Sequence, residues 1–325
     1  MQNIAHDLRI SVFTIGYTSA ADCRMVIGEL SRQTSAAQIE LIVVAPDRHG
    51  IDDSELEGFG AIQWLIVPKV ETCGEAMEIA VRAARAPLVV YAEEHSYFAE
   101  DWAERLLAAH ASGYDVVGFA IENANPDTLT SWAQLYGQFG PLVAPVESGE
   151  FDFLGGHHVS YRRDLLLEYG DQMAVVLEDE AALFLDLRAR GIRMQIAGDA
   201  ISRHVNVSSL PAFMYMDYQG QRSFAAARAA TSRWGWPKRV LYAAAAPLIP
   251  FVRMRRSLRD IRRTGRHKEL MPQILLPMSL ALIAGGVGEF MGYVLGAGSA
   301  AEKKAPTELQ RKNFVSKSDA MSAFR

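Results

Sequence analysis

The chain has 325 residues, of which 50% are hydrophobic and 22% charged, and its formal net charge is −5. This length and composition predict one large domain or two ordinary ones with a sizeable buried core. The two cysteines, Cys23 and Cys73, lack CxxC spacing and exclude a disulfide framework, so we expect reduced thiols in a cytosolic compartment.

The N-terminal stretch 1–9 contains Asp7 and has no apolar core before Ile10, which is unlike a signal peptide. Short apolar runs then alternate with helical patterns. We expect helices over 19–32, 73–85 and 101–111, and strands over 9–15, 39–44, 62–67, 87–91 and 115–120. This alternation predicts a largely parallel, doubly wound α/β sheet, which binds ligands at the carboxyl ends of its strands.

The following stretch has weaker signals. A loop-rich segment, 141–156, precedes helical patterns, and the stronger of these ends at Gly191, a good position for a helix C-cap. We expect helices over 162–168 and 178–190, then short strands over 193–196 and 200–204. The α/β domain is therefore assigned to residues 1–208.

The character of the sequence changes after Ser209. A helical pattern over 211–234 is followed by the run 253–268, which holds eight Lys or Arg residues and one acid. The stretch 275–297 is 23 residues long and almost wholly apolar, with Glu289 its only formal charge. Such a stretch is long enough to cross a bilayer, but its glycines and Glu289 leave an interfacial insertion or a soluble core helix open.

The basic residues of 253–268 lie between two apolar segments, 240–252 and 275–297. This arrangement favours an anionic membrane surface, and the positive-inside tendency places the basic residues on the cytoplasmic side. They are not interleaved with aromatics, so we expect membrane lipids as partners and no nucleic acid. We assign residues 209–269 to membrane-proximal helices, 270–298 to a transmembrane or interfacial helix, and 299–325 to a disordered tail.

Two common nucleotide-binding motifs are absent from the sequence. Gly16-Tyr17-Thr18-Ser19 follows the first expected strand, so there is no GxGxxG, and no GxxxxGK[ST] occurs. A dinucleotide or P-loop site is therefore not expected. Instead, Glu93-Glu94-His95 follows the strand over 87–91, where Glu93 and His95 could bind a divalent ion. A solvated turn is the alternative interpretation.

Two further clusters are polar. Glu178-Asp179-Glu180 opens a helix, where a carboxylate could act as a general base or simply cap the helix. Gly155-Gly156-His157-His158 precedes Tyr161-Arg162-Arg163; glycines allow a close backbone approach and arginine can neutralise phosphate, although a tight turn would also use these residues.

Together, the order of these clusters resembles the family 2 glycosyltransferases, which have the GT-A fold, over roughly residues 8–206. The stretches 11–18, 27–34 and 40–47 stand where that family has its first strand, first helix and second strand. Its metal-binding D-x-D falls on 93–95, and its E-D catalytic pair on 178–179. Two departures are Ala45, where the family usually has Asp, and E-x-H in place of D-x-D.

The resemblance implies a role for each matching residue. Asp179 would be the catalytic base, with Glu178 orienting it or the acceptor. The metal would be Mn²⁺ or Mg²⁺, held by Glu93, His95 and His204. Donor binding would fall on Thr14, Gly16, Tyr17, Asp47 and Glu94, and acceptor or diphosphate binding on Gly155, Gly156, His157 and Arg162.

The activity implied is inverting transfer of a sugar from a nucleotide-sugar donor. The acceptor would be a glycan, a lipid-linked molecule or a polysaccharide at the cytoplasmic face of the cell membrane. The altered metal motif keeps a second hypothesis open, in which the chain is a catalytically silent, membrane-bound GT-A-like binding or assembly protein.

Overall fold

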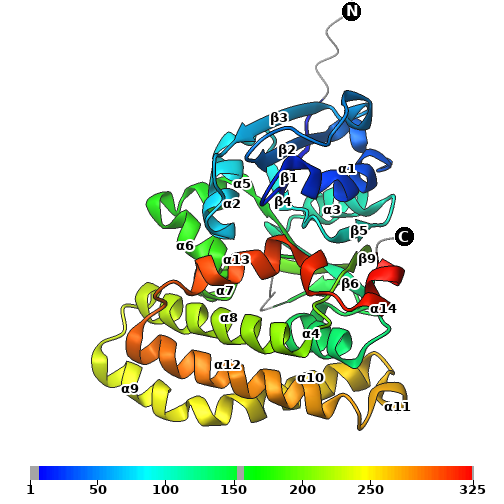
Figure 1. The fold of residues 1–325 in the computed structure, drawn as a ribbon. Coiled ribbons are helices and arrows are strands. Elements are labelled where there is room, and N and C mark those ends of the chain that lie inside the picture. Colours follow the sequence, from blue (N-terminus) through cyan, green and yellow to red (C-terminus); the bar gives the residue numbers. More distant parts are fainter. Residues whose placement is uncertain (1–6, 152–156, 324–325) are drawn as a thin grey trace, which may run out of the picture.

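The computed structural model describes residues 7–151 and 157–323 (Figure 1). Its strands are β1 (Ile10–Ile15), β2 (Ile39–Ala45), β3 (Ala61–Ile66), β4 (Leu88–Tyr91), β5 (Ser96–Phe98), β6 (Val116–Asn123), β7 (Gly149–Glu150), β8 (Val159–Arg162) and β9 (Met194–His204). Its α-helices are α1 (Arg24–Ser31), α2 (Cys73–Ala83), α3 (Trp102–Ala111), α4 (Leu129–Phe139), α5 (Arg163–Leu167), α6 (Met173–Glu178), α7 (Glu180–Ala189), α8 (Leu210–Thr231), α9 (Trp236–Ala245), α10 (Ile249–Arg263), α11 (His267–Leu270), α12 (Leu275–Leu295), α13 (Ala300–Leu309) and α14 (Lys317–Ala323).

The strands form one sheet in the order β3-β2-β1-β4-β8-β6-β9-β5, with β7 beside β9. Strands β3, β2, β1 and β4 are parallel neighbours, and β6 and β9 are parallel to each other. The short strand β8 lies antiparallel between β4 and β6, and β5 antiparallel to β9. The predicted fold class, a mostly parallel sheet flanked by helices, is confirmed.

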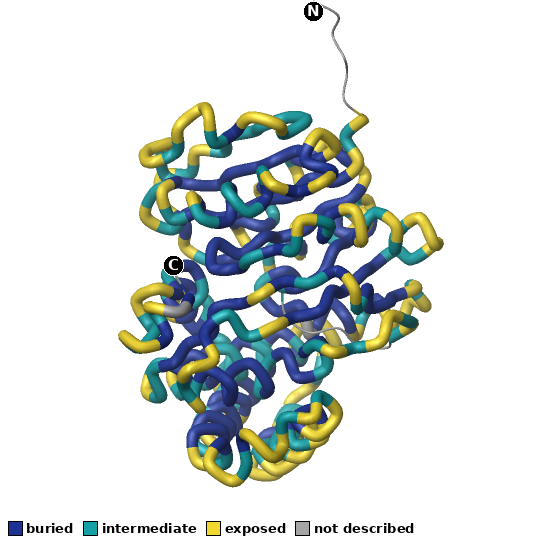
Figure 2. Tube along the Cα trace, turned by 90° about the vertical axis from the view of Figure 1, so that its right-hand side faces the viewer, coloured by how far each residue is buried: buried dark blue, intermediate teal, exposed yellow. Residues whose placement is uncertain are grey.

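Both faces of the sheet are covered by helices, as the buried strands at the centre of Figure 2 show. Alternation along β1 explains this, because Ile10 and Val12 pack with α1 and α3 on one face. Phe13 and Ile15 pack with α2 on the other. Strands that are buried on both faces read as continuous apolar runs, which is why β1 and β2 could be predicted from sequence.

The helices after β9 form an outer layer, in which α8 lies between the sheet and α9, α10 and α12 (Figure 1). Helix α12 packs closely on α8 through its glycines. A Cβ at Gly288 would lie 2.2 Å from the carbonyl oxygen of Tyr218, and one at Gly292 would lie 2.3 Å from that of Arg222. The glycines that weaken α12 as a helix therefore let two helix backbones approach each other.

Among the described residues, α12 is the one helix with the length and apolar character needed to cross a membrane, and half of its most apolar window is buried inside the protein. Glu289 on this helix is also buried and accepts a hydrogen bond from the Tyr293 hydroxyl at 3.0 Å. The one acid of the apolar stretch thus has a partner within the protein.

The expectation of a disordered tail over 299–325 is wrong for the part that the structure describes. This stretch forms α13 and α14, joined by a 3₁₀ turn, η7 (Arg311–Phe314). Its polar appearance misled the prediction, because Thr307, Arg311 and Asp319 are each at most 2% exposed. Arg311 and Asp319 contact partners far away in the sequence, whereas the Thr307 hydroxyl donates to the nearby carbonyl oxygen of Lys304.

Candidate active site

Polar residues gather at the carboxyl ends of the central strands. Gly16 follows β1, Asp47 follows β2, Glu93 follows β4, and His204 is the last residue of β9. Because β1, β2 and β4 run parallel, their ends meet at one edge of the sheet, which we call the carboxyl edge. The strand β5 pairs antiparallel with the end of β9, so Ser96 lies opposite His204 and the preceding His95 comes beside it.

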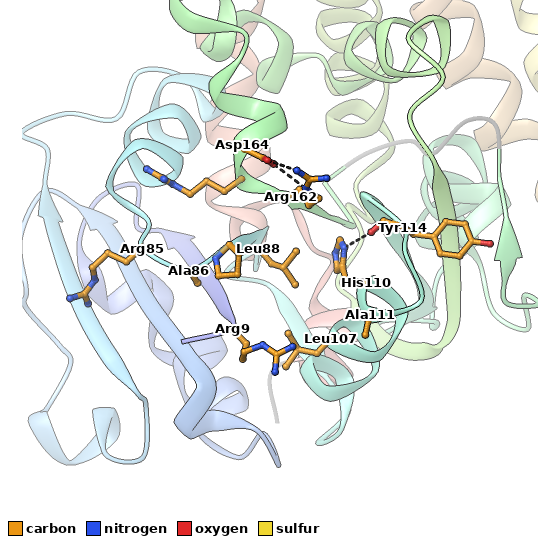
Figure 3. Close-up of a pocket in the computed structure, with 12 residues that line it drawn as sticks. Arg9, Arg85, Ala86, Leu88, Leu107, His110, Ala111, Tyr114, Arg162 and Asp164 are labelled. Carbon is orange, nitrogen blue, oxygen red and sulfur yellow. Dashed lines mark hydrogen bonds and ion pairs between the residues drawn. The ribbon is translucent and has the colours of Figure 1, made fainter. Parts of the chain in front are cut away.

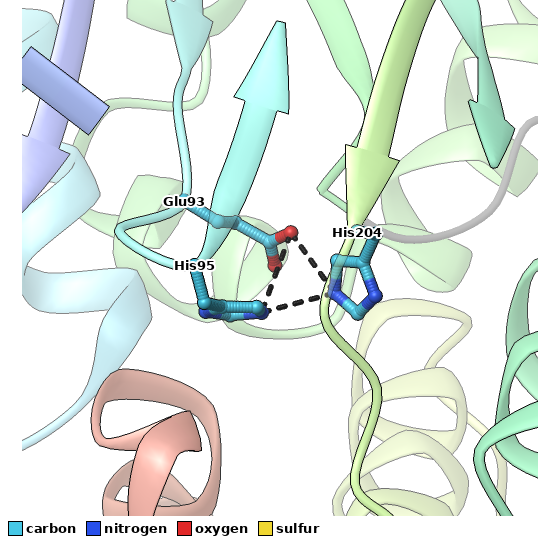
Figure 4. Close-up of side chains that lie close together, drawn as sticks. All are labelled: Glu93, His95 and His204. Carbon is cyan, nitrogen blue, oxygen red and sulfur yellow. Dashed lines mark hydrogen bonds and ion pairs between the residues drawn. The ribbon is translucent and has the colours of Figure 1, made fainter. Parts of the chain in front are cut away.

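Glu93 and His95, in the turn between β4 and β5, converge on one point with His204 at the end of β9 (Figure 4). Their ligand atoms all lie within 4.8 Å of one another. The Nε2 atoms of His95 and His204 are 3.0 Å apart, and a Glu93 carboxylate oxygen lies 3.3 Å from Nε2 of His204 and 3.8 Å from that of His95. Two nitrogens bound to one ion at about 2.1 Å lie roughly 3 Å apart, so this spacing fits a metal centre.

Neighbouring groups set the tautomers of both imidazoles. Nδ1 of His95 lies 3.0 Å from the Glu94 carboxylate, and Nδ1 of His204 lies 3.0 Å from the side-chain oxygen of Asn206. Both partners are acceptors, so each Nδ1 carries the proton and each Nε2 presents a lone pair to the common point. Outer partners that orient ligand histidines in this way are typical of metal sites.

Burial and neighbouring charges shift the pKa values of His204 and Glu93 in this triad. Desolvation lowers the pKa of His204 to about 4, although Glu93 raises it, so this ring is neutral near pH 7. Burial raises the pKa of Glu93, but His158, His95 and His204 outweigh it and hold that pKa well below its usual value. One carboxylate with two imidazoles is a donor set that suits Mn²⁺ better than Mg²⁺.

The candidate catalytic acids lie beside this point. The predicted helix over 178–190 is interrupted at Asp179, whose extended backbone (φ −133°, ψ 76°) separates α6 from α7. Asp179 is 9% exposed and lines a cavity of about 470 Å³ with Glu178, Glu180 and His157. The Glu180 carboxyl interacts electrostatically with Glu93, which links the cavity to the triad.

Glu178 is held by the fold. Its carboxylate accepts the Gly74 backbone N–H at 2.8 Å and lies 3.2 Å from the Lys304 ammonium. Gly74 opens α2, and a Cβ there would lie 2.2 Å from the carbonyl oxygen of Ala174, so glycine permits α6 to approach. Glu178 thus joins α6 to the N-terminus of α2, where a negative charge is stabilised.

Comparisons with known proteins bear on the fold. No family model and no curated protein matches the sequence. Among solved structures, the mannosyltransferase PcManGT from Pyrobaculum calidifontis, in complex with GDP-Man and Mn²⁺, superposes with a TM-score of 0.55 and 16% identity, over 89% of this chain and 90% of that one. TarS 1–349 from S. aureus, in complex with UDP, gives 0.47 and 13%, over 87% and 90%.

The chain has the GT-A fold. In this GT-A sheet, the residues expected to bind a donor lie at or near the carboxyl edge. A Cβ at Gly16 would lie 2.4 Å from the carbonyl oxygen of Ser19, so only glycine fits the turn after β1. Tyr17 follows this glycine and is partly buried. Asp47 accepts hydrogen bonds from the Ser19 hydroxyl and the His49 backbone N–H at 2.9 Å, which ties the two loops together.

Two of the residues expected to bind the donor, Thr14 and Glu94, are surrounded by other residues of the protein. Thr14 is fully buried in β1, and alternation along the strand places its side chain on the face that packs with α1 and α3. Glu94 orients His95, and its contact is with the metal ligand.

Arg162 lies away from the carboxyl edge, which corrects its predicted role in binding the acceptor or the diphosphate. It pairs with Leu88 at the beginning of β4, whereas Glu93 follows the end of that strand. Its guanidinium binds Asp115 at 2.9 Å and also Asp164, beside a separate pocket at the far edge of the GT-A sheet (Figure 3). The strand β8, which was not recognised in the sequence, carries Arg162 away from the site. Gly155 and Gly156 lie outside the described residues.

Several polar residues of the site have no role predicted from the sequence, although Glu180 and His158 stand in the polar clusters recognised there. His158 lies 3.3 Å from Glu93, and Glu180 accepts the Tyr161 hydroxyl at 3.0 Å and lies 3.4 Å from His157. Burial raises the pKa of Glu180 to about 7, although His157 and Tyr161 lower it. The signal for His158 was present in its histidine pair. Lys304 and Arg311 come from the segment expected to be disordered.

Proposed function

We propose that the chain is an inverting glycosyltransferase that moves a sugar from a nucleotide-sugar donor to a glycan, lipid-linked or polysaccharide acceptor. One observation carries the proposal. An oriented triad of ion ligands and a partly accessible carboxylate, Asp179, lie at the same edge of a GT-A sheet. A buried structural cluster has no need of three lone pairs aimed at one point, whereas a diphosphate-binding ion does.

The residues of this chain would divide the reaction between them. Asp179 lines the cavity that would admit the acceptor, and its carboxylate would take the proton of the attacking hydroxyl. The turn at Gly16 and the loop held by Asp47 would bind the nucleoside part of the donor. A single base and direct displacement at the anomeric carbon invert the configuration, so an α-linked donor yields a β-linked product.

Glu93, His95 and His204 would hold the divalent ion, and Glu94 and Asn206 would keep the two imidazoles in the ligating tautomer. When bound, the ion would supply positive charge that stabilises the leaving nucleoside diphosphate. The same residues would exclude water from the ion, because all three are at most 4% exposed.

The test is a panel of nucleotide sugars incubated with the full chain, with and without Mn²⁺, with release of the nucleoside diphosphate as the readout. We expect turnover with one donor class, stimulation by Mn²⁺, and a product of inverted anomeric configuration by NMR. Binding of donors without turnover, even with a range of acceptors, would favour a silent binding protein. Retention of configuration would contradict the mechanism.

The outer helical layer supports a membrane-associated site for this activity. Among the described residues, 18 large hydrophobic side chains are exposed, and 11 of them lie on α9, η6 (Ala246–Leu248), α10 and α12, including Leu248, Phe251 and Leu276. Exposed arginines of α10 adjoin them, among them Arg255 and Arg256. Apolar side chains beside cations fit the interface of an anionic bilayer. We propose that this layer rests on the cytoplasmic face of the membrane.

Vesicle flotation tests this attachment. The chain should float with vesicles that contain anionic phospholipid and less with purely zwitterionic ones. The double variant Leu248→Asp, Phe251→Asp should lose flotation, while Ile79→Asp, an exposed apolar position on α2, should keep it. Equal flotation of both variants would contradict the assigned surface.

A further inference from the structure

The C-terminal segment 300–323, which we call the strap, crosses the molecule between the sheet and α8 (Figure 1). It is fastened on the far side of the site. The Phe314 carbonyl accepts the backbone N–H groups of Ser208 and Ser209, just after β9. Asp319 accepts the Asp127 backbone N–H at 2.9 Å and the Thr128 hydroxyl at 2.7 Å.

Between these fastenings and α13, the strap inserts Arg311 into the candidate metal centre. The residue is 1% exposed, although arginine is almost never fully buried unless it is paired. Its Nε–H donates to Nε2 of His95 at 3.3 Å, and its terminal nitrogens contact Glu308 at 2.8 Å and the sulfur of Met216 at 3.3 Å.

The contact with His95 uses the lone pair that an ion would need. Nδ1 of His95 holds its proton toward Glu94, so Nε2 has the one lone pair in the plane of the ring. That lone pair can accept the Arg311 N–H or bind a metal, and it cannot do both. Without a cation, the facing lone pairs of His95 and His204 would repel each other, and the guanidinium relieves this.

Other cations of the strap meet acids of the same edge. The Lys304 ammonium lies 3.2 Å from Glu178, and the Lys312 ammonium lies 3.1 Å from Asp22 in the turn after β1. Asp22 also holds that turn by accepting the Thr18 backbone N–H at 2.9 Å. The strap therefore brings positive charge to the places where, under the proposed function, the ion and the donor diphosphate would bind.

We propose that the strap is an internal competitor of the divalent ion, with Arg311 and the metal mutually exclusive at His95. This inference rests on the proposed function, since it takes the triad to be the ion site. Metal binding requires Arg311 to leave His95, and the strap loosens with it. Only the molecules with an open strap can then bind the metal, so the apparent affinity equals the intrinsic affinity multiplied by the open fraction.

The experiment is a titration of the full chain with Mn²⁺ alone, followed by electron paramagnetic resonance of the free ion. Arg311→Ala should bind Mn²⁺ about tenfold more tightly than the wild type, because the competitor is gone. Asp319→Ala, which loosens the strap through residues outside the site, should tighten binding in the same direction. Arg105→Ala, which removes an exposed ion pair on α3, is the matched control and should not change it.

Hydrogen exchange of the wild type gives a second readout that needs no variant. Saturating Mn²⁺ should increase exchange of the backbone amides of 311–323 and leave β1 and β2 unchanged. Mn²⁺ binding with no tightening in either strap variant, and no change in exchange, would overturn the strap proposal and leave the ion site intact. Absence of Mn²⁺ binding in the wild type and both variants would overturn the ion site, and the competition with it.

Discussion

The carboxyl edge of the sheet and the outer helical layer differ in what they bury. Glu93 is 4% exposed and His204 is fully buried, whereas Phe251 is 72% and Leu276 68% exposed. Each region reverses the usual distribution of a soluble protein, with polar groups inside at the first and large apolar groups outside at the second. Under the proposed function, an ion and a diphosphate would explain the first reversal, and a membrane surface would explain the second.

The comparison also shows how the two regions depend on each other. The cavity lined by Asp179 is bounded on one side by the carboxylates at the junction of α6 and α7, Glu178, Asp179 and Glu180, and on the other by α8 and α10 of the outer layer. Under the proposed function, an acceptor would reach Asp179 through this cavity. Changes at the carboxyl edge should affect chemistry and ion binding, while changes in the outer layer should affect folding and attachment.

The largest effect is expected for Asp179→Asn. Loss of the general base should lower the rate of sugar transfer by about 10³-fold, because asparagine cannot accept the hydroxyl proton. Donor binding should stay within a few-fold of the wild type, as measured by titration with the nucleotide sugar. Normal turnover in this variant would remove Asp179 from the mechanism.

The next effect concerns Glu180 and pH. The folded state keeps this carboxyl protonated up to about pH 7, whereas the unfolded state releases the proton near pH 4.5. The free energy of unfolding of the wild type should therefore fall as the pH rises from 4.5 to about 7, and this group should account for roughly 3 kcal/mol of the fall. Glu180→Gln keeps an acceptor for the Tyr161 hydroxyl and should lack this fall in urea unfolding curves. Parallel curves for both proteins would contradict it.

A smaller effect is expected in the outer layer from Gly288→Ala. The added methyl group would press on the Tyr218 carbonyl, so the variant should lose about 2 kcal/mol of unfolding free energy. Gly28→Ala on α1 is the control, because a Cβ there meets nothing within 4 Å. It should be neutral or gain up to about 1 kcal/mol. Similar stabilities in the two variants would mean that α12 does not pack on α8.

The smallest effect is expected for Asn206→Ala, which removes the acceptor for Nδ1 of His204. With the tautomer no longer set, the affinity for Mn²⁺ should fall roughly tenfold, as measured by the same titration. Gln38→Ala, at an exposed position before β2, should leave the affinity unchanged. An unchanged affinity in the Asn206 variant would mean that this residue contributes to packing and does not orient His204.

The sequence by itself determined the α/β class and the long buried strands. It also determined that Glu93 follows the strand β4 and that Asp179 lies near the beginning of a helix. These features follow from local patterns, since apolar runs and the residues directly after them can be recognised without knowing their neighbours. The short strands β5 and β8 carry no such pattern. Their positions decided that His95 meets His204 and that Arg162 lies at the far edge.

Only the tertiary structure decided the environment of α12 and of the strap. An apolar helix with glycines has the same composition whether it crosses a bilayer or packs on α8, and the difference lies in which backbone its glycines contact. Likewise, the polar tail becomes ordered because Arg311 and Asp319 find partners more than 190 residues away in the chain. Burial and ion pairing are properties of neighbours in space, which a linear pattern does not contain.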